Sequence, residues 1–221
     1  MERKQKYARA ADDIDGYGND MVLYENQTLD WNDRIYLKVH PENDRKLKYW
    51  PENPKSFRYF WKFRRIYQQI KTDSGRAPQV HGKVFELTDD RFLKQYGDRP
   101  MERPLPFSYN KEVEGLQVLK DNKWYRVPIM PYALLVIVGD QVEIMSNGLL
   151  KSPVHRAVTN SEKERITVAM FCSPESGIDI EPVEELIDDK RPRLYKDSEG
   201  LSCNLLQYYQ QGKRPIDVVK I

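Results

Sequence analysis

The sequence predicts a mixed α+β fold, in which antiparallel strands over roughly residues 112–174 are flanked by helices on both sides. The strands are indicated by two apolar segments, 154–158 and 165–171. Residues 160–163, Asn-Ser-Glu-Lys, separate these segments and supply turn chemistry. We therefore expect the two segments to fold back on each other as a hairpin.

Helical patterns lie outside this region. Residues 1–11 have a charged helical pattern, and Ser56 can cap a helix that begins near Phe57. Toward the other end, Tyr208 and Tyr209 lie at helical spacing from Leu205, which is typical of helix packing. These patterns predict helices before and after the strands.

The connection between the first two helical patterns is irregular. Residues 12–19 are rich in turn-forming residues, and 29–39 predict a strand or short helix that packs through Trp31 and Tyr36. In the later strands we expect Cys172 to be a small buried residue. The residues expected in the core with it are Leu135, Met170 and Phe171.

Composition narrows the classes of partner. The chain has 221 residues, enough for one domain with a sizeable core. Its 36 Lys and Arg against 34 Asp and Glu give a net charge of +2, so no strong field favours nucleic acid or membranes. No long apolar run predicts a membrane span, and the first residues lack a secretory pattern. From these two observations we expect a cytoplasmic protein. Cys172 and Cys203 have no CxxC spacing, so we expect no disulfide framework and no zinc site.

The candidate site rests on His155 in the first apolar segment and Arg165 at the start of the second. In a hairpin, these two side chains could project into one cavity. An imidazole is a common metal ligand, and a guanidinium binds carboxylates through charge-assisted hydrogen bonds. The pair therefore suggests a metal ligand beside a carboxylate anchor.

The residues 136–174 resemble the second half of the core of plant Fe(II)- and 2-oxoglutarate-dependent dioxygenases. The group that they resemble contains norcoclaurine synthase-like oxygenases, senescence-related oxygenases and alkaloid O-demethylases. The resemblance implies that His155 is an iron ligand and that Arg165 and Thr167 hold the distal carboxylate of 2-oxoglutarate. Residues 111–131 resemble the preceding hairpin of that family.

The resemblance implies a partial double-stranded β-helix, or jelly-roll, with flanking helices. Its division would be a helical region at residues 1–100, with a divergent segment near 58–84, and the jelly-roll core with a C-terminal helix at 101–221. The cofactors implied are Fe(II) and 2-oxoglutarate, with ascorbate in support. The implied partner is a small-molecule substrate, and the oligomeric state stays open.

The His-x-Asp motif that carries the other two iron ligands in the family is missing. Residues 92–99, Phe-Leu-Lys-Gln-Tyr-Gly-Asp-Arg, are followed by a short segment that enters the 111–131 hairpin directly, so two core strands are expected to be absent. Of the other histidines, His40 has an acidic residue at the right spacing but is followed by proline, and His81 has none. A non-haem iron site needs three protein ligands, so we assign no catalytic residue.

Two alternatives remain open at this point. The chain is expected to oxidise a small plant metabolite, by hydroxylation or O-demethylation, or else to be a non-catalytic truncated form that at most binds a ligand or partner. A third class comes from residues 58–71, whose mixture of cations and aromatics is also found in single-stranded nucleic-acid binders. The balanced net charge favours a solvated helix face there instead.

Overall fold

The structure is a computed structural model, and part of the chain is described in it. The described residues are 2–19, 25, 33–53, 91–98, 101–106, 113–131, 133, 135–165, 167–175, 177–197, 208 and 211–221. The helix predicted from Phe57, the basic aromatic segment 58–71 and His81 lie outside them. Most of the helix predicted around Tyr208 does so too.

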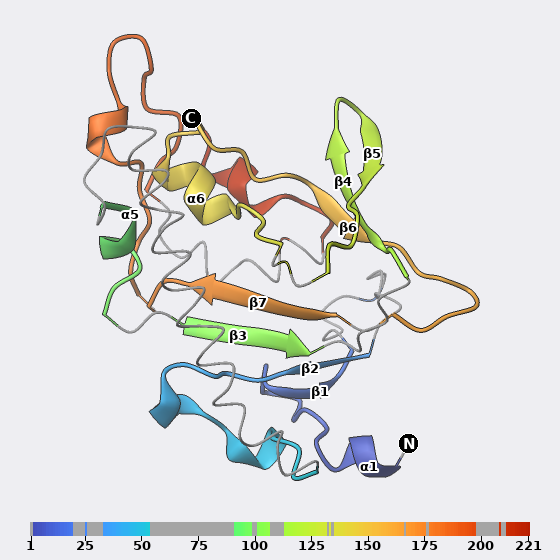
Figure 1. Ribbon diagram of the computed structural model, residues 1–221. Helices are drawn as coiled ribbons and strands as arrows, with labels where there is room; N and C mark the ends of the chain where they lie inside the picture. The colour runs from blue at the N-terminus through green and yellow to red at the C-terminus, as the bar shows by residue number, and fades with distance from the viewer. Residues whose placement is uncertain are drawn as a thin grey trace.

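The described strands form three small antiparallel sheets (Figure 1). The first sheet contains β1 (Gly16–Gly18) and β2 (Arg34–Tyr36), and the second contains β3 (Met101–Pro106) and β7 (Val168–Ser173). The third has the order β5 (Lys123–Arg126), β4 (Leu116–Lys120) and β6 (His155–Ala157). Strand β2 runs beside β3, while β4 and β5 project from the body (Figure 1).

The hairpin predicted within residues 111–131 is present as β4 and β5. Lys120 pairs with Lys123, and the two turn residues between them, Asp121 and Asn122, both have positive φ angles, of 49° and 56°. Two such residues form the turn whose twist matches that of antiparallel strands, and Asp and Asn tolerate this conformation.

The hairpin expected between the segments of His155 and Arg165 is not formed. Strand β6 pairs with β4, and β7 pairs with β3, so the two segments belong to different sheets. The turn chemistry is nevertheless as predicted, because the Asn160 side chain accepts hydrogen bonds from the backbone of Glu162 and Lys163, each at 2.9 Å. This turn carries the chain from one sheet to the other.

The described helices are short. The α-helices are α1 (Glu2–Gln5), α5 (Arg91–Lys94) and α6 (Asp140–Met145), and the 3-10 helices are η1 (Glu42–Asp44), η2 (Leu47–Tyr49), η3 (Glu184–Leu186) and η4 (Pro215–Val218). The first predicted helix therefore ends at Gln5, and β1 lies in the predicted connection. Helix α6 was not predicted. Within the described residues, no helix has the length and apolar character to cross a bilayer.

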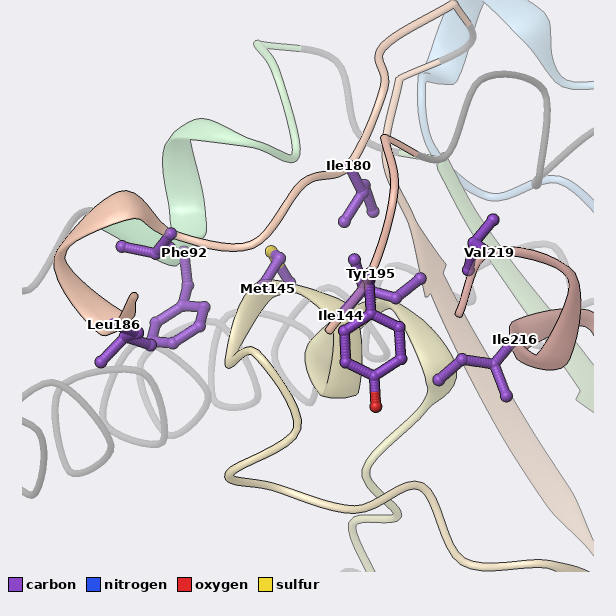
Figure 2. Close-up of a cluster of buried hydrophobic side chains, with 9 residues drawn as sticks. Phe92, Ile144, Met145, Ile180, Leu186, Tyr195, Ile216 and Val219 are labelled. Carbon is purple, nitrogen blue, oxygen red and sulfur yellow. The ribbon is translucent and has the colours of Figure 1, made fainter. Parts of the chain in front are cut away.

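The main core surrounds α6 (Figure 2). It consists of Phe92, Ile144, Met145, Ile180, Val183, Leu186, Tyr195, Ile216 and Val219. The expectation that Phe171 and Leu135 are core residues is wrong, since 51% and 59% of their surface is exposed. Cys172 is exposed as well, which corrects its predicted burial. Alternation along a strand shows that side chains point to two faces, but not which face is covered.

A second, smaller core holds Leu37, Tyr49 and Trp50 near the N-terminus, and it contains a buried carboxylate. Asp13 accepts hydrogen bonds from Lys46 at 2.7 Å and from the hydroxyl of Tyr49 at 3.0 Å. Burial alone would raise the pKa of Asp13, but the hydrogen bonds from Lys46, the Asp15 backbone and Tyr49 outweigh burial and lower the pKa to about 2.

Acid is therefore expected to destabilise the fold through Asp13. An unfolded aspartate has a pKa of about 3.9, so the stabilisation is present above about pH 4 and is lost as the pH falls toward about 2. Urea unfolding between these pH values should show a steeper loss for the parent chain than for Asp13→Asn. The exposed Asp189→Asn is the control and should follow the parent. Identical slopes for parent and Asp13→Asn would contradict the assignment.

Candidate functional site

His155 opens β6 and lies opposite Val118 of β4. Its side chain is exposed. The next residue, Arg156, points to the other face of this sheet, where its guanidinium donates to Gln117 at 2.9 Å and lies 4.0 Å from the ring centroid of Trp124. Alternation along the strand therefore separates His155 from this cationic and aromatic face.

The orientation of the His155 ring is linked to the residue two positions before it. Nδ1 lies 3.1 Å from the carbonyl oxygen of Pro153. A carbonyl only accepts hydrogen bonds, so a neutral ring that makes this contact carries its proton on Nδ1. The lone pair then belongs to Nε2, and that is the atom with which the ring could bind a metal.

Arg165 lies against Gly115, the residue before β4. A Cβ atom built on Gly115 would lie 2.7 Å from Cδ and 3.0 Å from Nε of Arg165. The Gly115 carbonyl also accepts a hydrogen bond from the Val158 backbone at 2.6 Å. A larger residue at position 115 would require the Arg165 side chain to shift from this place. Gly115 was not singled out from the sequence, where it is one glycine in a predicted hairpin.

The guanidinium of Arg165 is partly buried, and burial lowers its pKa below the usual value. In the described part of the chain it has no ion-pair partner, and neither Glu162 nor Glu164 contributes to the shift in pKa. A cation that loses water without gaining an acceptor is unfavourable. This position therefore favours an anionic ligand.

Thr167 supplies a second unsatisfied group two residues further along. Its Oγ1 atom is buried and has no hydrogen-bond partner among the described residues. Buried hydroxyls are nearly always hydrogen-bonded, and one without a partner costs about 1–3 kcal/mol. A carboxylate could accept from both the Arg165 guanidinium and the Thr167 hydroxyl. These two residues thus fit the carboxylate-binding role expected of them.

Strand β4 links the two halves of the candidate site. Arg165 lies against Gly115 before the strand begins, and His155 lies opposite Val118. Three residues along a strand span about 10 Å. His155 therefore lies on the strand that pairs with β4, and Arg165 lies against the residue before β4, whereas the sequence suggested two strands of one hairpin.

The described residues do not provide the set of ligands that an iron site needs. Among them, no three His, Cys, Asp or Glu side chains form a group that could hold a metal ion. His40 precedes η1, and Figure 1 shows η1 and β6 on opposite sides of the sheet of β3 and β7. We therefore derive no chemical step through a metal.

Comparison with known proteins gives a consistent family. The model of the 2OG-Fe(II) oxygenase superfamily matches residues 90–174. The chain is 33% identical to lateral branching oxidoreductase 1 of Arabidopsis thaliana, with 100% of this chain and 68% of that protein covered. It is 32% identical to S-norcoclaurine synthase 1 of Coptis japonica, with 100% and 69% covered.

Solved structures agree in fold. A crystal structure of JOX2 in complex with 2OG, Fe and JA matches with a TM-score of 0.87 and 26% identity, covering 100% of this chain and 73% of that one. The dioxygenase for auxin oxidation in rice matches with a TM-score of 0.71 at 18% identity, covering 100% and 80%, which is a likeness of fold alone. The jelly-roll architecture is thereby confirmed, while the mixed α+β description is not.

The alignments also contain a gap. The one with the Arabidopsis thaliana protein runs over 251 positions, although this chain has 221 residues, so at least 30 positions have no counterpart here. The chain spans between 59% and 69% of the length of the curated relatives that it matches. A gap of this size is large enough for the two core strands that are expected to be absent.

Proposed function

The chain belongs to the 2OG-Fe(II) oxygenase superfamily, and from that premise we propose that it binds 2-oxoglutarate through Arg165 and Thr167 but oxidises a substrate very slowly. The single observation that carries this proposal is the buried, unpartnered hydroxyl of Thr167, two residues after the partly buried guanidinium of Arg165. Both groups donate hydrogen bonds, and neither has an acceptor among the described residues. The far carboxylate of 2-oxoglutarate supplies acceptors for the two together.

Slow turnover is proposed from the sequence. The chain contains three histidines, and the His-x-Asp motif is missing from the stretch where the family has it. A facial set of three ligands fixes the geometry of a non-haem iron centre, and one imidazole cannot set it alone. His155 would be the remaining ligand, through Nε2.

The substrate class follows from the family. The relatives include enzymes named as flavonol synthase, S-norcoclaurine synthase and leucoanthocyanidin dioxygenase. We accordingly propose a small plant metabolite as the original substrate, oxidised by hydroxylation or O-demethylation, with ascorbate in support and the cytosol as the compartment. The second candidate function is full catalysis, and the kinship with these enzymes favours it.

Two measurements separate the candidates. Calorimetry is expected to detect 2-oxoglutarate binding, while succinate release with Fe(II) and a panel of alkaloids and flavonoids stays near background. No detectable binding would overturn the proposal. Succinate formed in proportion to oxidised substrate, and lost in His155→Ala, would establish the catalytic function instead.

A further inference from the structure

The segment that leads to His155 is held by side chains on both sides. The backbone N–H of Ser152 donates to Oε2 of Glu143 at 2.6 Å, and the Ser152 carbonyl accepts from Nη2 of Arg214 at 3.0 Å. Two residues later, the Val154 carbonyl accepts from the Leu119 backbone at 2.8 Å. These hydrogen bonds therefore fix the backbone on both sides of Pro153, directly before His155.

One of these side chains, Glu143, is itself held by the C-terminal part of the chain. Only 3% of Glu143 and 1% of Tyr195 are exposed, and the Tyr195 hydroxyl donates to Oε1 of Glu143 at 2.8 Å. The ring of Tyr195 packs with Ile144 and Ile216, and its hydroxyl points out of the cluster (Figure 2). The position of the carboxylate thus depends on Tyr195.

The two C-terminal stretches that supply Tyr195 and Arg214 are joined to each other. The backbone of Lys196 donates to Val219 at 2.8 Å, and that of Ile221 donates to Leu194 at 3.0 Å. Arg214 also lies 3.8 Å from Asp140 at the start of α6. Residues 191–197 and 211–221 are therefore attached to α6 and to Ser152 at the same time.

A contact between the His155 ring and the Pro153 carbonyl links the histidine to this segment of backbone. Nδ1 lies 3.1 Å from the Pro153 carbonyl, and Pro153 follows the residue that Glu143 and Arg214 hold. Partners of this kind fix the tautomer and orientation of a metal-binding histidine. A shift of the Ser152 backbone would move the carbonyl that orients the ring.

We propose that Arg214 and Tyr195 are positioning residues for His155, through the backbone of Ser152 and the carboxylate of Glu143. Through these two residues, the stretches 191–197 and 211–221 determine which nitrogen of the His155 ring carries the lone pair. The importance of this role rests on the proposed function, in which His155 is the remaining metal ligand. The geometry itself does not depend on whether 2-oxoglutarate binds.

The test is the tautomer of His155, observed by long-range ¹H–¹⁵N spectra of the full chain at about pH 8, where an ordinary histidine is neutral. The three histidines of the chain are distinguished with a His155→Gln variant. The parent should show His155 with its proton on Nδ1. In Arg214→Ala and Tyr195→Phe the nitrogen shifts should move toward the mixture of tautomers found in a free peptide, while His40 and His81 stay unchanged.

Two further variants test whether the change in the His155 signals comes from loss of the cationic donor at residue 214. Arg214→Lys keeps a cationic donor and should restore much of the parent spectrum. Arg193→Ala removes an arginine from the other C-terminal stretch, 191–197, where it pairs with Glu181 and Asp197, and it should leave His155 unmoved. Parent-like His155 signals in Arg214→Ala and Tyr195→Phe, or an equal change in Arg193→Ala, would overturn the proposal. Loss of 2-oxoglutarate binding with these results intact would count against the proposed function alone.

Discussion

Replacing Arg165 with alanine is expected to weaken 2-oxoglutarate binding by about 2–5 kcal/mol, or roughly 30-fold to several thousand-fold. The reason is that the guanidinium is already partly stripped of water, and without the ligand it has no acceptor in the described part of the chain. Calorimetric titration of the parent and Arg165→Ala with 2-oxoglutarate measures the loss.

A matched control lies on β6. Arg156→Ala removes the same charge from an exposed arginine that bonds to Gln117, so it should leave the affinity within about twofold of the parent. Because Arg165→Ala also removes a partly buried cation that has no ion-pair partner among the described residues, the variant should unfold at no lower temperature than the parent. Unchanged affinity in Arg165→Ala, or an equal loss in Arg156→Ala, would remove Arg165 from the site.

Thr167→Val separates binding from stability at the same position. The hydroxyl of Thr167 is buried without a partner, so replacing it with a methyl group should leave the free protein as stable as the parent, or more so. The same change removes a donor to the ligand and should weaken 2-oxoglutarate binding by about 1 kcal/mol. A residue that served packing alone would not show this opposition of effects.

Local backbone chemistry was readable from the sequence. The hairpin of β4 and β5 and the turn built on Asn160 depend on residues that are adjacent in the chain, and both are present. The pairing of β6 with β4 and of β7 with β3 depends on segments far apart. An apolar alternating segment has the same pattern whichever strand it joins, so the expected hairpin was wrong.

The burial of individual residues also could not be predicted from the sequence. Phe171 and Leu135 are apolar side chains of the kind found in cores, yet both are largely exposed, because burial is decided by the elements that pack over a residue and not by its type. Helix α6, only six residues long, is too short for a helical period to be distinct in the sequence. The core that forms around it was therefore not foreseen.

For the candidate site, the sequence indicated the site residues but not the residues that support them. His155, Arg165 and Thr167 were named from their resemblance to a family, and the family is confirmed, while the roles of the three residues remain predictions. What the sequence could not indicate is the support around them. Tyr195 and Glu143 are 52 residues apart, and Arg214 and Ser152 are 62 apart, so only folding brings them into contact.

Glu143 is part of this support, and Glu143→Ala is expected to lower the free energy of unfolding by about 3 kcal/mol. The substitution leaves the buried hydroxyl of Tyr195 and the partly buried N–H of Ser152 without their acceptor. Tyr195→Phe removes one donor and leaves the carboxylate bonded to Ser152, so it should cost about 1 kcal/mol. Urea unfolding of both variants gives the two values.

A double-mutant cycle and a pH series test the cause. Because Glu143 and Tyr195 contact each other, the two changes together should cost about 1 kcal/mol less than their sum. As a control, replacing the exposed Glu184 of η3 with alanine should stay within about 0.5 kcal/mol of the parent. Burial first, and Glu143 second, raise the pKa of Tyr195, so its stabilisation is present below about pH 10 and lost as the pH rises further. Strictly additive costs for Glu143→Ala and Tyr195→Phe would mean that the carboxylate and the hydroxyl stabilise the fold independently.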